Sequence, residues 1–445
     1  MAESRTIGVF GAGWVGLVTG GCFAELGHTV IVRDVMSDRI EALRAGRLPF
    51  HEADLPEVLD RNRDRIRYTV DADDLADADV LFICVQTPPT YSGDADLSFV
   101  WSALDDLPRV GRRQILVMKS TVPVGTGEKV RAALEGRELA NVGYVSNPEF
   151  LAEGHAVRDF LNPDRIVIGA FADEDGAAVE ALYAGIEAPV VRTDVASAEM
   201  IKLAANAFLM TRISFINEIA NVCEAVGADV VEVAKGVGLD HRLGPHFLRA
   251  GIGYGGSCFP KDSLALKQLA SNSGYHFHLL SAVIEVNELQ KRRVVQKLQK
   301  HLGKLRGKKI ALLGLAFKAG TDDMREAPSL VLASRLLAEG AEVRAWDPVA
   351  RPGELMKGAV FYDSVLEAVR DADAAVIVTE WDELRGLASK DVHDAMARPL
   401  ILDGRNLLDP AETRAAGFAY EGIGRPSSPF EALPETAEPQ TRVNN

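Results

Sequence analysis

The chain repeats one pattern of apolar runs and glycine turns, and this repeat constrains the fold more than any other feature. RTIGVF (5–10) enters the glycine turn GAGWVG, a helical segment follows, and HTVIVRD ends in an acid. KKIALLGLAFK (308–318) and AEVRAWDP (341–348) repeat that order in the second half. Alternating strands and helices of this kind form open parallel sheets with helices on both faces. The sequence therefore predicts an α/β fold with two Rossmann-like, doubly wound parallel-sheet domains.

The first glycine turn has the form GxGxxG, with an acidic residue at the end of the next strand. The glycines permit a tight turn and let a pyrophosphate approach the N-terminus of the following helix. Asp34 would accept hydrogen bonds from the adenosine ribose and repel a 2′-phosphate, which favours NAD over NADP. The nearby Arg33 and Arg39 weaken this preference slightly, unless they are solvated charges. We assign cofactor binding to Gly11, Gly13, Val15, Gly16, Asp34 and Arg39.

A second glycine-rich stretch, GIGYGGSCFPKD at 251–262, surrounds Cys258. Pro260 fits the first turn of a helix, so Cys258 should lie at a helix N-terminus, where partial positive charge favours a thiolate. Asp262 follows on the same helix face. A lone cysteine is more often a small core residue, but a glycine-wrapped thiol beside a carboxylate suits covalent catalysis. We therefore predict that Cys258 is a catalytic nucleophile.

Polar side chains follow several of the predicted strands. Thr87 follows the apolar run 79–85, and Thr121 follows the run 114–119. Strand ends of this kind lie at the carboxyl edge of an open α/β sheet, where ligands bind. Glu149 and Glu153 come just after a further strand, either as acids of the site or as a solvated pair at a helix start.

The middle of the chain reads as a helical section. A long helical pattern begins at about 196, and a second runs from about 276 to 302. Lys202 and Asn206 share one helix face among Ala and Leu residues, and a lysine on an apolar face needs a partner or a function. The predicted order is a dinucleotide-binding domain, a central helical section with a spine helix that suits a homodimer or higher homo-oligomer, a second sheet domain and a disordered tail: 1–195, 196–303, 304–425 and 426–445.

The first turn of the second sheet domain lacks the full GxGxxG pattern, so we expect no second dinucleotide there. Phe317, Lys318 and Arg325 stand near this turn instead, and Arg405 ends a further strand in LILDGRN. A lysine and an arginine at the ligand edge of a sheet suit a phosphate group. This domain is therefore predicted to bind an anionic ligand.

Charge and cysteine usage exclude several functions. The formal net charge of −15 argues against a nucleic-acid-binding surface, which needs a basic face. The four cysteines have no zinc spacing, so we expect free thiols, no metal site and a reducing, cytoplasmic location. The polar start MAESR does not form a signal peptide, and no apolar run is long enough for a membrane span.

Seven motifs then occur in a characteristic order: GAGWVG, CVQTP, STVPVG, NPEFLAEG, a K-x-x-x-N helix, GYGGSCFPKD and FKxGTDDMREAP. Together they resemble the UDP-glucose 6-dehydrogenase family over about residues 5–425. The wording GGSCFPKD, and Arg242 in DHRLGPHF, are more similar to the UDP-glucose branch than to enzymes acting on GDP-mannose or UDP-N-acetylmannosamine. The resemblance implies that UDP-glucose, two NAD⁺ and water give UDP-glucuronate and two NADH, through a thiohemiacetal and a thioester on Cys258.

The resemblance also implies roles for individual residues. Lys202 and Asn206 would stabilise negative charge on the C6 oxygen, as an oxyanion hole does, and Asp262 and Thr121 would order the water. Either Glu149 or Glu153 could be the base. On the cofactor side the implied residues include Thr87, Thr121, Glu153, Lys261 and Arg325. The implied substrate residues are Glu149, Phe150, Leu151, Lys202, Asn206, Arg242 across a dimer interface, Phe247, Tyr254, Gly255, Phe317, Lys318 and Arg405.

Three alternatives stay open at this stage. The same chemistry could act on GDP-mannose or a UDP-N-acetylhexosamine. A two-electron dehydrogenase of the 6-phosphogluconate type also has a Rossmann domain, long helices and a catalytic Lys and Asn, but needs neither Cys258 nor a second sheet domain. A non-enzymatic NAD-binding sensor would leave Cys258, Lys202 and Asp262 without a reason to converge. The NADH yield per product separates the four-electron chemistry, which gives two NADH, from the two-electron dehydrogenase, which gives one.

Overall fold

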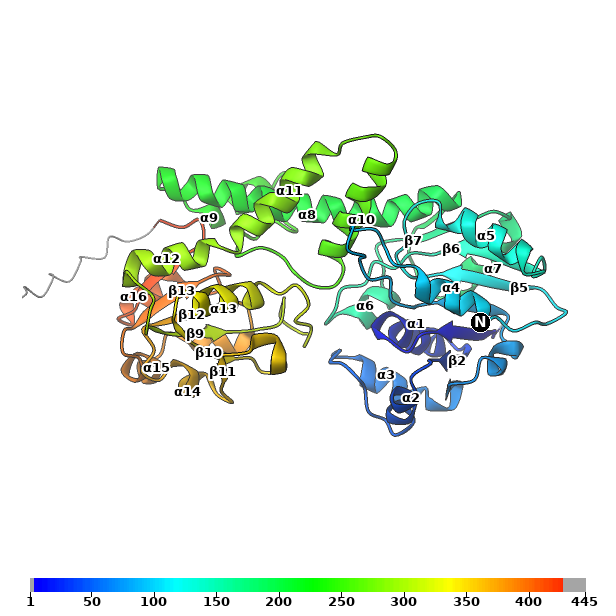
Figure 1. Ribbon diagram of the computed structural model, residues 1–445, viewed down its shortest axis with the longest axis horizontal. Coiled ribbons are helices and arrows are strands. Elements are labelled where there is room, and N and C mark those ends of the chain that lie inside the picture. Colours follow the sequence, from blue (N-terminus) through cyan, green and yellow to red (C-terminus); the bar gives the residue numbers. More distant parts are fainter. Residues whose placement is uncertain (1–3, 427–445) are drawn as a thin grey trace, which may run out of the picture.

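The computed structural model describes residues 4–426 and contains two α/β domains joined by a helical section (Figure 1). One helix, α8 (Val195–Val226), is 32 residues long and runs along the top of both domains. The chain thus has the predicted fold class, with a spine helix between two sheets. The tail predicted to be disordered, 426–445, lies outside the described residues except for Pro426.

The first domain contains a sheet of eight strands in the order β3-β2-β1-β4-β5-β6-β7-β8. Strand order reverses at β1, which pairs in parallel with both β2 and β4, so the carboxyl ends of β1 and β4 form the ligand-binding edge. The strands are β1 (Thr6–Phe10), β2 (Thr29–Arg33), β3 (Ile66–Thr69), β4 (Val80–Ile83), β5 (Gln114–Met118), β6 (Val142–Ser146), β7 (Ile166–Ala170) and β8 (Val190–Thr193).

One pairing in this sheet is antiparallel, between β6 and β7, which the sequence did not indicate. The connection between them contains only the six-residue helix α6 (Ala156–Leu161). A parallel pairing needs a crossover that returns the chain to the opposite edge. This connection stays at the carboxyl edge, so β7 runs back and β8 pairs parallel to it.

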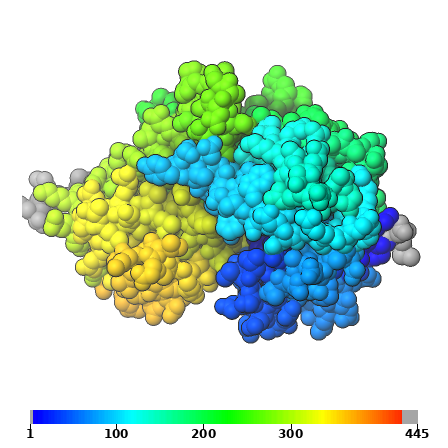
Figure 2. Space-filling model, turned by 45° about the vertical axis from the view of Figure 1, so that its right-hand side comes forward, coloured from blue at the N-terminus to red at the C-terminus, as the bar shows by residue number. Residues whose placement is uncertain are grey.

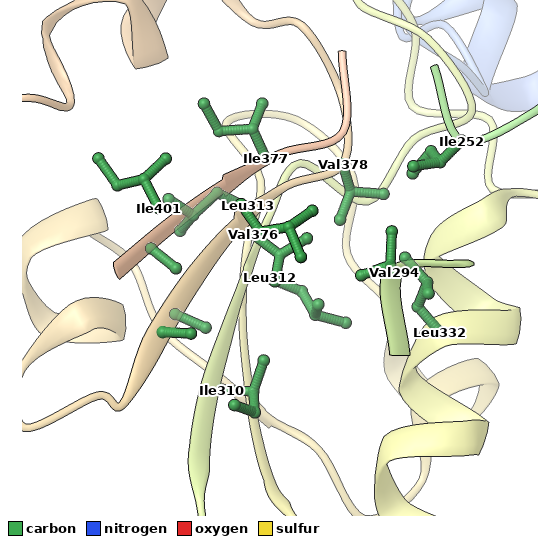
Figure 3. Packing of buried hydrophobic residues seen from close by; sticks show 14 of the residues in the cluster. Ile252, Val294, Ile310, Leu312, Leu313, Leu332, Val376, Ile377, Val378 and Ile401 are labelled. Atoms are coloured by element: carbon green, nitrogen blue, oxygen red, sulfur yellow. The ribbon is translucent and has the colours of Figure 1, made fainter. Parts of the chain in front are cut away.

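The second domain contains six parallel strands in the order β11-β10-β9-β12-β13-β14, which repeats the arrangement around β1. Its core packs Ile310, Leu312 and Val376 of the sheet against Leu332 and Val294 of two helices (Figure 3). The strands are β9 (Lys309–Leu313), β10 (Glu342–Trp346), β11 (Val360–Phe361), β12 (Ala374–Ile377), β13 (Leu400–Asp403) and β14 (Ala419–Gly422).

Short helices cover both sheets. Those of the first domain are α1 (Trp14–Glu25), α2 (Ser37–Arg44), α3 (Leu55–Arg61), α4 (Ser98–Asp105), α5 (Thr126–Gly136) and α7 (Asp173–Leu182), with 3₁₀ turns η1 (Arg63–Arg65) and η2 (Asp73–Asp77). Those of the second are α13 (Pro328–Ala338), α14 (Val365–Val369), α15 (Lys390–Ala395) and α16 (Pro410–Ala415), with η3 (Gly353–Met356) and η4 (Asp382–Gly386). Within residues 4–426 no helix is both long and apolar enough to cross a membrane.

The central section adds α9 (Val230–Gly238), α10 (Phe259–Asn272), α11 (His278–Gln290) and α12 (Arg293–Leu302). The helical pattern at 276–302 is thus two helices, interrupted after Gln290. The two halves serve different cores: Leu280 and Val283 of α11 pack in the cluster of α8 and α10, whereas Val294 and Leu298 of α12 pack in the second sheet domain. The helical pattern is interrupted because its apolar positions pack into two different hydrophobic cores.

The glycine turn after β9 does not reproduce the dinucleotide site of the first domain. The carboxylate of Asp347 accepts hydrogen bonds from the backbone N–H groups of Leu315 (2.7 Å), Ala316 (3.1 Å), Val349 (2.9 Å) and Ala350 (2.7 Å). It also accepts one from Trp381 Nε1 (3.0 Å). Because the protein's own donors saturate this carboxylate, it is not free to bind a ribose.

Candidate active site

A cavity of about 1150 Å³ lies where the two sheet domains and the central helices meet. Figure 2 shows the first domain, in blue and cyan, meeting the second, in yellow, along the middle of the molecule. The cavity wall combines the strand ends and the glycine turn of the first domain, the start of α10, one face of α11 and the loop at 321–326 of the second domain. The two predicted glycine-rich motifs therefore open into one space.

The first glycine turn has the shape that a dinucleotide needs. Gly11 has φ of +99°, and a Cβ there would lie 2.7 Å from the carbonyl oxygen of Cys84. A Cβ at Gly16 would collide with the carbonyl oxygen of Gly11, whereas Gly13 has nothing within 4 Å. Gly13 and Val15 line the cavity at the N-terminus of α1. The turn is therefore tight on its protein side and open on its cavity side, as a pyrophosphate requires.

Asp34 lies buried at the end of β2 and organises this turn. It accepts hydrogen bonds from the N–H groups of Ala12 (2.8 Å) and Met36 (2.9 Å), and from Arg39 (2.9 Å). Arg39 also lines the cavity. Two exposed apolar residues, Val35 and Met36, directly follow Asp34. They were not among the residues predicted from the sequence, although they are visible in the motif VRDVM. These residues suit a nucleoside with an apolar base and a polar ribose.

Cys258 is the N-cap residue of α10, as the sequence predicts, and it lines the cavity. The expected low pKa of its thiol is wrong. Burial, together with the carboxylates of Glu149 and Asp262, raises the pKa of Cys258 to about 11, although Lys202 opposes the shift. The side chain accepts no hydrogen bond from the first turn of α10, so the helix N-terminus does not offset the burial. The resting thiol is therefore protonated at neutral pH.

Lys202 and Glu149 form a buried ion pair, with 2.9 Å between Nζ and Oε1 and both side chains 5% exposed. Burial alone would raise the pKa of Glu149, but Lys202 and the N–H of Leu151, at 2.6 Å, outweigh it and lower that pKa. Burial likewise opposes the charge of Lys202, but Glu149, Cys258 and Asp262 raise its pKa. Both groups are held in their charged forms beside Cys258.

A hydrogen-bonded chain connects most of the remaining predicted catalytic residues. Asn206 Nδ2 donates to Asp262 (2.6 Å), and Lys261 Nζ donates to the other oxygen of Asp262 (2.7 Å) and to Thr87 Oγ1 (3.4 Å). Thr87 Oγ1 in turn donates to the carbonyl of Thr121 (2.8 Å). Four elements separated in the sequence are thus linked around the thiol.

Glu153 joins the two sheet domains. It accepts a hydrogen bond from Thr321 (3.0 Å) and lies 3.7 Å from Arg325, which also pairs with Asp323 (2.7 Å). Burial, followed by the charge of Asp323, raises the pKa of Glu153 to about 7. Lys318 is near this group, and its burial lowers its pKa. The predicted residues Glu153 and Arg325 therefore belong to a charged contact between the two sheet domains at the cavity.

Most of the predicted substrate residues pack against other parts of the same chain. Tyr254 lines the cavity, a Cβ at Gly255 would collide with the carbonyl of Glu326, and the Phe317 ring packs on Gly256. Phe150 stacks against Arg165, whose Cζ lies 3.6 Å from the ring centre. The guanidinium of Arg405 is taken up by three loop carbonyls, those of Val378 (2.7 Å), Gly253 (3.3 Å) and Phe317 (3.3 Å).

Arg242 and Phe247 do not reach the cavity of their own chain. Arg242 is 76% exposed and paired with Asp240, and Phe247 is 42% exposed. Both lie on the segment between α9 and α10. Arg212 of α8 holds this segment by donating to the carbonyls of Leu243 (2.8 Å) and Gly244 (2.7 Å). The contact predicted for Arg242, across a dimer interface, stays a prediction, as does the substrate contact of Phe247.

The sequence reading missed two buried residues of the site. Lys119 directly follows β5, lines the cavity, and donates to Asn147 Oδ1 and the Tyr183 hydroxyl, each at 3.0 Å. Burial lowers the pKa of this lysine to about 8. Glu52 accepts from Trp14 Nε1 (2.7 Å) and from the N–H of Gly154 (2.8 Å). The sequence signal for Lys119 was its position as a lysine at the end of the apolar run QILVMK.

The fold and the site together define a class of protein: a dinucleotide-dependent α/β enzyme with a second ligand domain facing the first. Three models of the UDP-glucose/GDP-mannose dehydrogenase family match the chain: the NAD binding domain at 5–187, the central domain at 196–289 and the UDP binding domain at 311–410. The chain belongs to this family. Its cofactor is therefore NAD, as the sequence predicts.

Relatives of known name agree with this placement. The chain is 45% identical to the UDP-glucose 6-dehydrogenase TuaD of Bacillus subtilis over 435 residues, which cover 95% of this chain and 94% of that protein. A UDP-glucose dehydrogenase structure from Pyrobaculum islandicum matches with a TM-score of 0.89 at 37% identity, covering 95% of this chain and 98% of the other. A UDP-D-ManNAc dehydrogenase from Pyrococcus horikoshii matches with a TM-score of 0.85 at 30% identity, covering 95% and 100%.

Proposed function

We propose that this protein oxidises UDP-glucose to UDP-glucuronate, using two NAD⁺ and one water and releasing two NADH and three protons. The observation that carries the proposal is that Cys258 lines a cavity between an NAD-binding and a UDP-binding domain, with the buried charges of Lys202 and Asp262 acting on its thiol. The names of the relatives support UDP-glucose as the substrate. A simple two-electron dehydrogenase has no need of the thiol.

Bound NAD⁺ supplies the hydride acceptor at C6 in both oxidations. The Lys202 ammonium stabilises the C6 oxygen as its proton leaves, and the Asn206 amide can donate to the same oxygen. Glu149 keeps Lys202 charged through the 2.9 Å ion pair. The pKa of Glu149 is lowered, so this carboxylate acts as the counter-ion of Lys202 in the resting enzyme and as a poor proton acceptor.

The Cys258 sulfur adds to the C6 aldehyde while the thiol proton passes to the C6 oxygen, which forms a carbon–sulfur bond and a neutral thiohemiacetal. Loss of a hydride from C6 and of a proton from the C6 hydroxyl gives a thioester. Water then attacks the thioester carbonyl, the carbon–sulfur bond breaks, and the thiol and carboxylate are released. Asp262, held by Asn206 and Lys261, is placed to orient that water. Because the pKa of Cys258 is high, its proton leaves during the reaction and not in the resting enzyme.

We also propose that the protein works as a homodimer through α8. Three large apolar residues on this helix are exposed at intervals of seven residues: Phe208 (63%), Phe215 (52%) and Val222 (57%). Seven residues are close to two helical turns, so they form one stripe. Arg212, on the same helix face as Phe208 and Phe215, holds the segment that carries Arg242, so that segment would lie beside the proposed interface. Phe215→Glu should give a monomer by light scattering, and an unchanged mass would contradict the dimer.

The substrate proposal is tested by measuring NADH formation with UDP-glucose, GDP-mannose, UDP-N-acetylglucosamine and UDP-N-acetylmannosamine. We expect turnover with UDP-glucose and two NADH for each uronate formed. One NADH per product would indicate a two-electron dehydrogenase. Faster turnover with a UDP-N-acetylhexosamine would place the chain with relatives such as the Pyrococcus horikoshii enzyme.

A further inference from the structure

The loop that leads to Cys258 is held by side-chain amides in place of a neighbouring strand. The N–H of Gly251 donates to Asn217 Oδ1 (2.9 Å), and its carbonyl accepts from Gln290 Nε2 (2.8 Å). The N–H of Tyr254 donates to Asn287 Oδ1 (2.8 Å), and its carbonyl accepts from Asn287 Nδ2 (3.2 Å). Three amides from α8 and α11 thus satisfy all four backbone groups of two loop residues. We call Asn217, Asn287 and Gln290 the amide clamp.

The amide clamp is fully buried. Asn217 is 0%, Asn287 3% and Gln290 1% exposed. A buried amide that loses its partner keeps the cost of desolvation without a hydrogen bond to offset it, so these side chains need the loop as much as the loop needs them. Gly253 has φ of +94°, and a Cβ there would lie 2.8 Å from Asn287 Oδ1. Glycine at 253 is therefore required by the clamp as well as by its backbone angle.

The clamp fixes the loop against α8, which carries Lys202 and Asn206, and against α11, which lines the cavity. Asn217 lies on α8, the helix that carries Lys202 and Asn206. Asn287 lines the cavity together with Tyr254 and Cys258. Beyond Tyr254, the N–H of Gly256 donates to the carbonyl of Arg325 (2.9 Å), so the segment is held again before it reaches the thiol. The distance between the Cys258 sulfur and the groups on α8 depends on this register.

We propose that the amide clamp, with Asn287 as its central member, is a set of positioning residues that places the Cys258 sulfur against the C6 aldehyde. This inference rests on the proposed function. The first hydride transfer does not use the thiol, whereas the second oxidation requires sulfur addition. A loosened loop therefore affects the second step more than the first. A displacement of about 1 Å in a reacting group can lower a rate about 10²-fold.

The test compares clamp variants with a matched control on the same two helices. Asn287→Leu removes both hydrogen bonds to Tyr254 with little change of volume. Gln290→Met removes the bond to the Gly251 carbonyl and also the acceptor of Asn221 Nδ2 (3.3 Å). Gln290 does not line the cavity, so this variant excludes a direct substrate contact. Ser214→Ala is the control, because the buried Ser214 of α8 donates to the carbonyl of Val283 in α11 (2.9 Å) and does not touch the loop.

Each protein is mixed with UDP-glucose, NAD⁺ and a hydrazine trap, and aldehyde hydrazone, uronate and NADH are counted. Asn287→Leu should lower uronate formation about 10²-fold and raise the trapped aldehyde per uronate at least tenfold. Its KM for NAD⁺ should stay within twofold of the wild type. Gln290→Met should shift in the same direction by a smaller factor, and it decides the outcome if Asn287→Leu does not fold. Ser214→Ala should lose thermal stability without changing the aldehyde share.

An unchanged aldehyde share in both clamp variants would overturn the inference, as would an equal rise in Ser214→Ala. The proposed function fails separately, through the wild type. If the unmodified protein yields one NADH per product, there is no second oxidation for the clamp to serve. If it yields two, the partition between aldehyde and uronate tests the clamp alone.

Discussion

The ammonium of Lys202 lies 2.9 Å from the carboxylate of Glu149, and both side chains are buried beside Cys258. A buried pair of this kind is costly to break, because the remaining charge has no water to stabilise it. The same pair keeps a positive charge next to the predicted position of the C6 oxygen. We therefore expect Glu149 to act on the substrate through Lys202.

Glu149→Gln should expose this dependence. Without the anion, burial lowers the pKa of Lys202, so the alkaline limb of the kcat profile should move to lower pH. We expect kcat at neutral pH to fall about 10²–10³-fold, the scale seen on removing one transition-state donor, and the fold to lose about 3–5 kcal/mol. Glu135→Gln, an exposed position on α5, is the control. An unshifted alkaline limb would contradict the role of the pair.

Asp34→Ser tests the cofactor site. The variant removes the acceptor for the Ala12 N–H and releases Arg39, which can then meet a 2′-phosphate. NAD⁺ should bind at least tenfold more weakly, and the preference for NAD⁺ over NADP⁺ should narrow. Calorimetric binding of UDP-glucose should stay unchanged. A loss of UDP-glucose affinity with intact NAD⁺ binding would reverse the assignment of the two domains.

Much of the fold could be predicted because its signals are local. The turn at Gly11–Gly16, the acid at Asp34 and their partial repeat after β9 fix two sheets of the same type. Two features depended on packing between distant elements. The reversal at β7 follows from a connection that stays at one edge of the sheet, and the break after Gln290 follows from two cores competing for one helical pattern.

The sequence predicted which of the site residues would lie close together better than it predicted their electrostatics. Lys202, Asn206, Asp262 and Cys258 do converge, but the sequence suggested a low thiol pKa from the helix N-terminus. Burial and two carboxylates reverse that direction, and burial is a property of the folded molecule. Lys119 escaped notice for a related reason: its role depends on Asn147 and Tyr183, which only the fold brings to it.

Glu153 should make stability depend on pH. Its folded pKa of about 7 lies above its ordinary value of 4.5, because burial and Asp323 disfavour the carboxylate. Between these values the folded state holds a proton that the unfolded state has released, so this group's contribution to stability falls as pH rises from about 4.5 to 7. Glu153→Gln removes the titration and should gain on the order of 2–3 kcal/mol relative to the wild type across that window. A difference in unfolding free energy between Glu153→Gln and the wild type that is the same at pH 5 and at pH 7 would rule this out.

The thiol pKa predicts the pH dependence of alkylation. With a pKa of about 11, the thiolate fraction of Cys258 should grow tenfold per pH unit from 7 to 9.5, without a plateau. Iodoacetamide inactivation should follow that slope, and UDP-glucose should protect. Lys202→Met should slow labelling at fixed pH, because Lys202 favours the thiolate. A midpoint below 8.5 would mean that the thiol is activated in the resting enzyme.

Cys258→Ala separates the two oxidations most sharply. In the proposed mechanism the first hydride transfer needs the C6 alcohol, Lys202 and NAD⁺, whereas the second needs a tetrahedral adduct that sulfur addition provides. The variant should bind both ligands and fold normally, since it removes one small side chain at the edge of a cavity. Uronate formation should fall by several orders of magnitude, the scale seen when a nucleophile is removed.

The product that remains decides the mechanism. Cys258→Ala should release C6 aldehyde that a hydrazine reagent traps, with one NADH for each trapped molecule. Lys202→Ala should differ by slowing the first step as well, because its charge serves the C6 oxygen throughout. Single-turnover NADH traces for the two variants provide the comparison. Near-normal formation of two NADH per sugar by Cys258→Ala would end the covalent mechanism, since the second oxidation would then proceed without a carbon–sulfur bond.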